Sequence, residues 1–168
     1  MAKDKINVLL VDDEEVLLDS IKRRLQLRDL NVIAVNRGDK ALEVARNHPV
    51  DVAILDLKMP GMSGKDVLLN LKKEHPWLEI IILTGHGSFD PEKDGAYGKA
   101  YTYLAKPCDL ATLLKVLMEA YQKTVMNRHK IARQEIENLL RGTNLKSPRE
   151  ILQKLIELDK EKNLKNAK

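Results

Sequence analysis

The chain has 168 residues and a formal net charge of +4; 43% of its residues are hydrophobic and 32% are charged. This size suits one globular domain with a modest appendage. No apolar run approaches the ~18 residues of a membrane span, the N-terminus lacks the apolar stretch of a signal peptide, and the single cysteine, Cys108, cannot form an internal disulfide. We therefore expect a cytoplasmic protein and exclude a membrane-spanning or disulfide-rich secreted class.

Short aliphatic runs alternate with helical patterns over the first 120 residues or so. Five runs predict strands, at 7–11, 31–35, 52–55, 80–83 and 100–104. The segments between them carry apolar residues at helical spacing, and in the first such helix, 15–27, the expected buried face is Val16, Leu17, Ile21 and Leu25. Because each crossover must return to the same end of the sheet, this alternation predicts a doubly wound α/β domain with a parallel sheet.

Polar side chains stand just past the ends of these predicted strands. Asp12 and Asp13 follow the first, Asp56 the third, Thr84 the fourth and Lys106 the fifth. The carboxyl ends of parallel strands line one crevice, so these groups are expected to converge. Three carboxylates brought together need a cation, and oxygen ligands with an open side suit Mg²⁺ better than Zn²⁺. The lysine and the threonine can then contact a further anion.

Each of these residues also has a plainer interpretation. Asp12 and Asp13 can cap a helix and complement its dipole, Thr84 can belong to a loop, and Lys106 to a turn. It is the complete set, in order at four strand ends, that favours a functional site.

Four segments carry a family resemblance: LLVDDEE, ILDLKMPGMSG, IILTGHGS and YLAKP. Together they resemble the receiver domain of two-component response regulators, over roughly residues 5 to 123. The resemblance implies a flavodoxin-like five-stranded sheet of order 2-1-3-4-5. It also implies a phosphoacceptor that serves a sensor histidine kinase and assists its own phosphorylation and dephosphorylation, rather than an enzyme. We expect a receiver domain over 1–123 and a helical extension over 124–168.

The same resemblance assigns roles at the site. Asp56 would be the phosphoacceptor, with Lys106 neutralising the phosphoryl group. Mg²⁺ would be held by Asp13, Asp56 and the main-chain carbonyl of Lys58, while Asp12 would act largely through a bound water.

Two further positions match the conformational switch of this family. The phosphorylated site would draw the Thr84 hydroxyl inward, which frees space for Tyr103 on the last strand to turn in. One segment departs from the family pattern, because Pro91, Gly95 and Gly98 are poor helix residues. We therefore predict a short, frayed or mobile fourth helix over 89–99.

The C-terminal part predicts two helices. Asp109 can cap a helix that meets no Gly or Pro until Gly142, and a continuous helix over 110–140 would be ~46 Å long. A second helix is expected to begin at Pro148, so an antiparallel hairpin follows. The apolar stripe of the first helix needs a partner and consists of Val125, Ala132, Ile136 and Leu139.

The extension leaves the output open. Its Lys and Arg outnumber Asp and Glu by 11 to 6 over 124–168. The main prediction is a helical hairpin that forms a homodimer or binds a downstream protein. The alternative is a DNA-binding transcriptional regulator with a minimal output module, although a helix-turn-helix uses a shorter turn and normally a third helix. His129 is expected to be a surface histidine rather than a phosphotransfer histidine.

Overall fold

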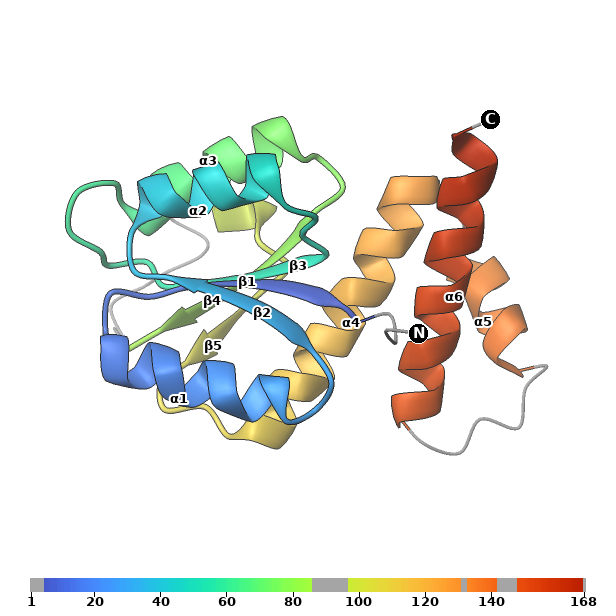
Figure 1. The fold of residues 1–168 in the computed structure, drawn as a ribbon, viewed down its shortest axis with the longest axis horizontal. Helices are drawn as coiled ribbons and strands as arrows, with labels where there is room; N and C mark the ends of the chain where they lie inside the picture. Colours follow the sequence, from blue (N-terminus) through green and yellow to red (C-terminus); the bar gives the residue numbers. More distant parts are fainter. Residues whose placement is uncertain (1–4, 86–96, 131–132, 142–147, 168) are drawn as a thin grey trace.

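The computed structural model describes residues 5–85, 97–130, 133–141 and 148–167. Its parallel sheet has the strand order β2-β1-β3-β4-β5. The strands are β1 (Asn7–Val11), β2 (Asn31–Val35), β3 (Val52–Leu55), β4 (Glu79–Thr84) and β5 (Thr102–Ala105). Helices α2 (Gly38–Asn47) and α3 (Gly64–Glu74) cover one face, and α1 (Glu15–Gln26) and α4 (Leu110–His129) cover the other (Figure 1). The predicted flavodoxin-like fold is confirmed.

The sheet separates two apolar layers because alternate side chains of each strand point to opposite faces. Leu10 and Ile54 belong to the layer beneath α1 and α4, whereas Leu9 and Leu55 belong to the layer beneath α2 and α3. Every residue of β3 and of β4 is buried. This two-sided burial explains why those strands read as continuous hydrophobic runs rather than as alternating patterns.

The buried face of α1 differs from the predicted one. Val16 is 87% exposed, whereas Leu18 and Leu25 are buried and Ile21 packs against them. The residues at 18, 21 and 25 keep helical spacing, so the buried face of α1 is rotated: Leu18 of the first turn faces the sheet, and Val16 faces away from it.

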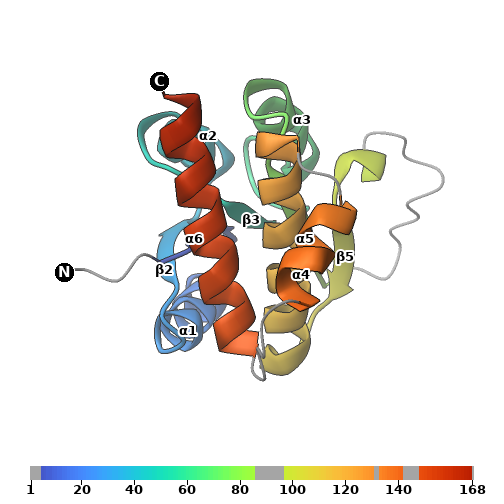
Figure 2. The same ribbon diagram turned by 90° about the vertical axis from the view of Figure 1, so that its right-hand side faces the viewer.

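In the described part of the C-terminal region the structure has three helices, whereas the sequence predicted a hairpin of two. The helix from Leu110 ends at His129, because Lys130 has left-handed backbone angles, with φ 53° and ψ 42°. A second helix, α5 (Arg133–Arg141), follows, and then α6 (Pro148–Asn166). Helix α6 lies beside α4 and runs in the same direction (Figures 1 and 2).

Two residues of the predicted apolar stripe, Val125 and Ile136, find their partner within this chain; Ala132 and the side chain of Leu139 lie outside what the structure describes. Val125 and Ile136 are fully buried and belong to the same core as Leu155 of α6 and Leu117 of α4. The predicted boundary at residue 123 falls inside α4, so the core of the receiver continues into the extension.

A buried polar cluster joins α6 to the rest of the molecule. Asp159 of α6 accepts hydrogen bonds from Arg128 at 2.8 Å and from the Tyr121 hydroxyl at 3.3 Å, and lies 2.5 Å from His129 Nε2. Arg128 also contacts Asp51, immediately before β3, at 3.1 Å. The side chain of His129 is only 1% exposed, so the expectation of a surface histidine was wrong. His129 is buried because α6 packs against it, and its contact on α6, Asp159, lies thirty positions further along the chain.

The segment 89–99 is described only at its end, where Tyr97–Lys99 form a short 3-10 helix, η1. The rest of the predicted fourth helix lies outside the described residues. Within the part of the chain that the structure covers, none of the helices is both long enough and apolar enough to span a membrane.

Candidate functional site

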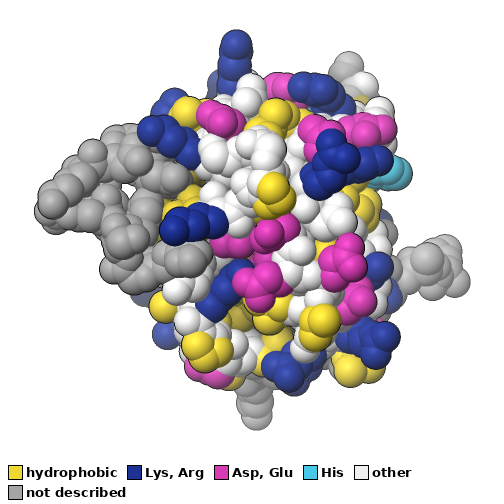
Figure 3. Space-filling view, turned by 90° about the vertical axis from the view of Figure 1, so that its left-hand side faces the viewer, with side chains coloured by type: hydrophobic (Ala, Val, Ile, Leu, Met, Phe, Trp, Pro, Cys, Tyr) yellow, Lys and Arg dark blue, Asp and Glu magenta, His cyan; other side chains and the backbone are white. Residues whose placement is uncertain are grey.

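Three carboxylates meet at the carboxyl edge of the sheet. Asp12 and Asp13 follow β1, Asp56 follows the neighbouring β3, and the register pairs Val11 with Leu55 directly before them. One oxygen from each carboxylate lies within 4.8 Å of the others. Asp12 and Asp56 are buried and Asp13 is exposed. Figure 3 views this edge of the molecule and shows acidic side chains gathered near its middle.

Lys106 brings a positive charge to this cluster. Its Nζ lies 2.6 Å from Asp12 Oδ2, 3.5 Å from Asp56 Oδ2 and 3.6 Å from Glu14 Oε1. Burial disfavours the ammonium, but the hydrogen bond to Asp12 and the surrounding carboxylates outweigh it and raise the pKa of Lys106. The side chain is therefore a firmly charged cation.

Asp56 stands in a balance of opposing effects. Burial raises its pKa, and the charge of Asp12 acts in the same sense. The charge of Lys106 and a hydrogen bond from the main chain of Lys58 act in the opposite sense. The net result is a carboxyl pKa above the ordinary range. The three acidic groups thus carry more negative charge than Lys106 neutralises, and their hard oxygen atoms fit Mg²⁺.

The loop after Asp56 is held close to the start of α3. A Cβ atom at Gly64 would lie 2.3 Å from the main-chain oxygen of Asp56 and 2.6 Å from Leu57 Cα. The Gly64 N–H donates to the Leu57 carbonyl at 3.0 Å, and the Ser63 hydroxyl caps α3 by accepting from the Asp66 N–H at 3.2 Å. This close approach fixes the main chain on both sides of Lys58.

The two predicted switch residues lie on the neighbouring strands. Thr84 is the buried last residue of β4, and its carbonyl accepts a hydrogen bond of 2.8 Å from the Lys106 N–H. Tyr103 of β5 pairs with Ile82 of β4, and its half-buried side chain packs on the face of the sheet that α2 and α3 cover. Thr84 is therefore joined to the acidic cluster through Lys106, whereas Tyr103 lies within the sheet.

Sequence reasoning missed two residues of this site. Glu14 follows no predicted strand end directly and was not among the predicted site residues, although its carboxylate lies 3.6 Å from Lys106 Nζ. Gly64 was not singled out, and the only signal for it was a glycine directly after the Ser63 cap. The other expected residues at this edge, Asp12, Asp13, Asp56 and Lys106, do lie together.

Comparisons of sequence agree with this geometry. The family model of the response regulator receiver domain matches residues 8–118. The probable transcriptional regulatory protein TcrX of Mycobacterium tuberculosis is 31% identical over 119 residues, which cover 71% of this chain and 51% of that protein. The transcriptional regulatory protein GlrR of Escherichia coli is 30% identical over 124 residues, covering 74% of this chain and 28% of that protein. The chain thus aligns with about half or less of these relatives.

Solved structures show the same likeness. The response regulator TrrA of Thermotoga maritima, in complex with Mg(2+)-BeF, has a TM-score of 0.64 and 27% identity, and the match covers 68% of this chain and 98% of TrrA. A CheY-like receiver domain of Methanospirillum hungatei has a TM-score of 0.67 and 26% identity, covering 72% and 97% respectively. On this evidence the chain belongs to the response regulator receiver domain family.

Proposed function

We propose that this protein is a phosphorylation-activated response regulator that accepts a phosphoryl group on Asp56 from a sensor histidine kinase. The observation that supports it most is the position of Asp56, whose carboxylate lies 3.5 Å from Lys106 Nζ among two further acidic residues. A buried carboxylate beside a fixed cation is suited to attack an electrophilic phosphorus atom.

The proposed transfer is a displacement at phosphorus. A carboxylate oxygen of Asp56 forms the new P–O bond, the P–N bond to the donor histidine breaks, and its electron pair returns to the imidazole. Charge is spread over the phosphoryl oxygens in this reaction, so catalysis consists mainly of positioning and neutralisation. Lys106 neutralises these oxygens, and the Thr84 hydroxyl donates a hydrogen bond to one of them.

We further propose that Mg²⁺ binds in the acidic cluster. Asp13, Asp56 and the main-chain carbonyl of Lys58 would hold it, and Asp12 would act through a bound water. When bound, the ion supplies the positive charge that lets a carboxylate and a phosphoryl group approach each other. The donor set supports this proposal, and so does the TrrA complex with Mg(2+)-BeF.

The proposed output is a change in association. Phosphorylation would draw Thr84 toward the phosphoryl group and let Tyr103 turn in, and the altered surface would change homodimerisation or binding of a downstream protein through the helical extension. DNA binding is the alternative, because two of the relatives are named transcriptional regulators. Binding to duplex DNA that weakens steeply with salt would favour this alternative.

Light scattering tests the proposal. The molar mass is measured in Mg²⁺ before and after addition of beryllofluoride, and the Asp56→Asn variant serves as the control. Intact-mass spectrometry after incubation with acetyl phosphate tests the acceptor separately. We expect a phosphorylated adduct and a change in association in the wild type alone. An adduct that persists in Asp56→Asn would contradict the assigned acceptor, and an unchanged molar mass would contradict the assigned output.

A further inference from the structure

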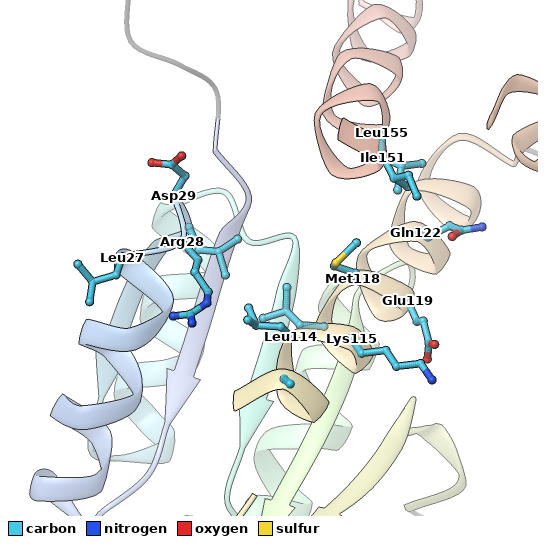
Figure 4. Close-up of a pocket in the computed structure, with 13 residues that line it drawn as sticks. Leu27, Arg28, Asp29, Leu114, Lys115, Met118, Glu119, Gln122, Ile151 and Leu155 are labelled. Carbon is cyan, nitrogen blue, oxygen red and sulfur yellow. The ribbon is translucent and has the colours of Figure 1, made fainter. Parts of the chain in front are cut away.

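Helix α6 creates an apolar groove that lies outside the acidic site. The groove has a volume of about 700 Å³ and is bounded by the end of α1, by α4 and by α6 (Figure 4). Its α6 wall starts thirty residues beyond the receiver match, which ends at residue 118. The main apolar lining residues are Leu30, Leu114, Leu117, Met118, Ile151 and Leu155.

The lining of the groove is apolar surface that the fold leaves partly uncovered. Leu30, Leu117 and Leu155 are buried, but Leu114, Met118 and Ile151 are only half-buried. Protein interiors are normally packed without spaces of this size, whereas sites for small ligands have volumes of roughly 300 to 1,000 Å³ and mainly apolar walls. The unbranched side chain of Met118 can adapt its shape to a flexible ligand.

Two cations at the rim indicate the charge of the ligand. The Arg28 side chain extends along the α1 wall, opposite Leu114, and its Nη1 donates to the Arg24 carbonyl at 3.2 Å (Figure 4). Among the described residues, neither Arg28 nor Lys115 forms an ion pair with a carboxylate. Of the two acidic lining residues, Glu119 accepts a hydrogen bond from the Tyr101 hydroxyl at 3.3 Å, and Asp29 points away from the groove. Arg28 therefore presents a guanidinium to the α1 side of the groove that no carboxylate pairs with among the residues the structure describes.

We propose that this groove binds a free, single-chain amphiphile that has an unbranched apolar tail and a carboxylate head group. The tail lies on Leu114 and Met118 beneath α6, and the carboxylate binds the guanidinium of Arg28. An arginine can contact a carboxylate through two parallel hydrogen bonds, which fixes the position of the head group. This inference does not depend on phosphorylation of Asp56.

Calorimetry of the full chain with dodecanoate, below its micelle concentration, tests the proposal. We expect saturable binding of one molecule per chain. Leu114→Trp fills the groove and should weaken binding about tenfold or more. Leu164→Trp is the matched control, because Leu164 is an exposed residue of α6 that does not line the groove. Met118→Trp serves as a second filling variant if the urea unfolding of Leu114→Trp is altered.

A second pair of variants tests the head group. Arg28→Glu should weaken dodecanoate binding about tenfold, whereas Arg24→Glu, with the same change in charge one turn earlier, should stay within about twofold of wild type. Dodecyltrimethylammonium, which has the same tail and the opposite charge, should bind more weakly than dodecanoate to the wild type. Equal effects of the two arginine variants, or no saturable binding, would overturn the proposal. Sedimentation with phosphatidylglycerol vesicles without binding of free dodecanoate would also overturn it, in favour of a membrane surface.

Discussion

Lys106 lets two buried carboxylates stand side by side. Its contacts with Asp12 and Asp56 offset part of their mutual repulsion, yet the pKa of Asp56 remains raised by burial and by Asp12. One lysine therefore leaves part of the repulsion between these carboxylates uncompensated. Uncompensated repulsion of this kind is typical of functional sites.

We expect Asp56→Asn to stabilise the metal-free protein at neutral pH. A carboxyl group whose pKa is higher in the folded than in the unfolded state destabilises the fold as the pH rises from the ordinary carboxyl range, near 3.9, through the folded value. The asparagine variant lacks this loss. Urea unfolding in EDTA should give similar midpoints for variant and wild type at low pH and a higher midpoint for the variant at pH 7.5.

The same comparison in saturating Mg²⁺ provides the control. Ligand binding to the folded state stabilises the wild type, and the variant lacks one of the ligands, so the order of the midpoints should approach equality or reverse. An advantage of Asp56→Asn that is equally large at every pH would contradict the electrostatic explanation.

Gly64 should not tolerate a side chain. The methyl group of Gly64→Ala would overlap the main chain at Asp56 and Leu57, and neither main-chain atom can rotate away. We expect a loss of about 1 to 3 kcal/mol in the free energy of unfolding, together with weaker binding of Mg²⁺. The control is Gly98→Ala, whose Cβ would meet nothing within 4 Å and should change stability by less than ~0.5 kcal/mol.

The positions of the acidic residues were predictable, and the reason is the geometry of the fold. Once the strands are recognised as parallel, their ends must share one edge, so the order in the chain suffices to bring Asp12, Asp56 and Lys106 together. The contact at Gly64 was not predictable in the same way, because it depends on the path of a loop and not on any periodic pattern.

The end of α4 shows the limit of sequence patterns for helices. No glycine or proline interrupts the chain near Lys130, and intrinsic propensity predicts that the helix continues. The structure breaks the helix there because α5 must turn back to bury Ile136. Tertiary packing thus forces a lysine into a conformation that costs roughly 1 to 2 kcal/mol for residues other than glycine.

Lys130→Gly should relieve this cost. We expect the free energy of unfolding to rise by about 1 kcal/mol, because glycine adopts left-handed angles without steric penalty. Lys115→Gly, in the interior of the same helix, is the matched control and should lower stability by about 1 kcal/mol. Thermal unfolding measures both. Equal losses in the two variants would show that the helix continues past residue 130 in solution.

The receiver and its extension form one body through the cluster around Asp159. The charge of this aspartate is shared by Arg128, His129 and Tyr121, and Arg128 carries the contact onward to Asp51. No local sequence pattern predicts this cluster, because Asp51 and Arg128 are 77 positions apart in the chain. Long-range pairs of this kind were beyond the reach of the sequence.

Asp159→Asn should loosen α6. The substitution removes one of the two carboxylates that pair with the part-buried Arg128, which then keeps only Asp51. We expect a loss of about 1.5 to 3 kcal/mol in the free energy of unfolding. Amide exchange should become faster in α6 than in the strands. Glu157→Gln on the same helix is the control, because its ion pair with Lys154 is exposed and should contribute less than about 0.5 kcal/mol. Unchanged exchange in α6 of Asp159→Asn would show that apolar contacts alone hold the helix.

Strand β3 connects the acidic crevice to the polar cluster that holds α6. Asp56 leaves one end of it and Asp51 enters the other, and its main chain pairs with β1 on one side and β4 on the other. A strand bonded on both sides neither stretches nor slides unless its ladders break. Asp56, the proposed phosphoacceptor, and Asp51, which anchors α6 through Arg128, thus lie at the two ends of one strand, about 17 Å apart at 3.3 Å per residue. Because α6 is held through Arg128 and Asp51 at one end of β3, and Asp56 stands at the other end, this strand fixes the position of the extension relative to the acidic crevice.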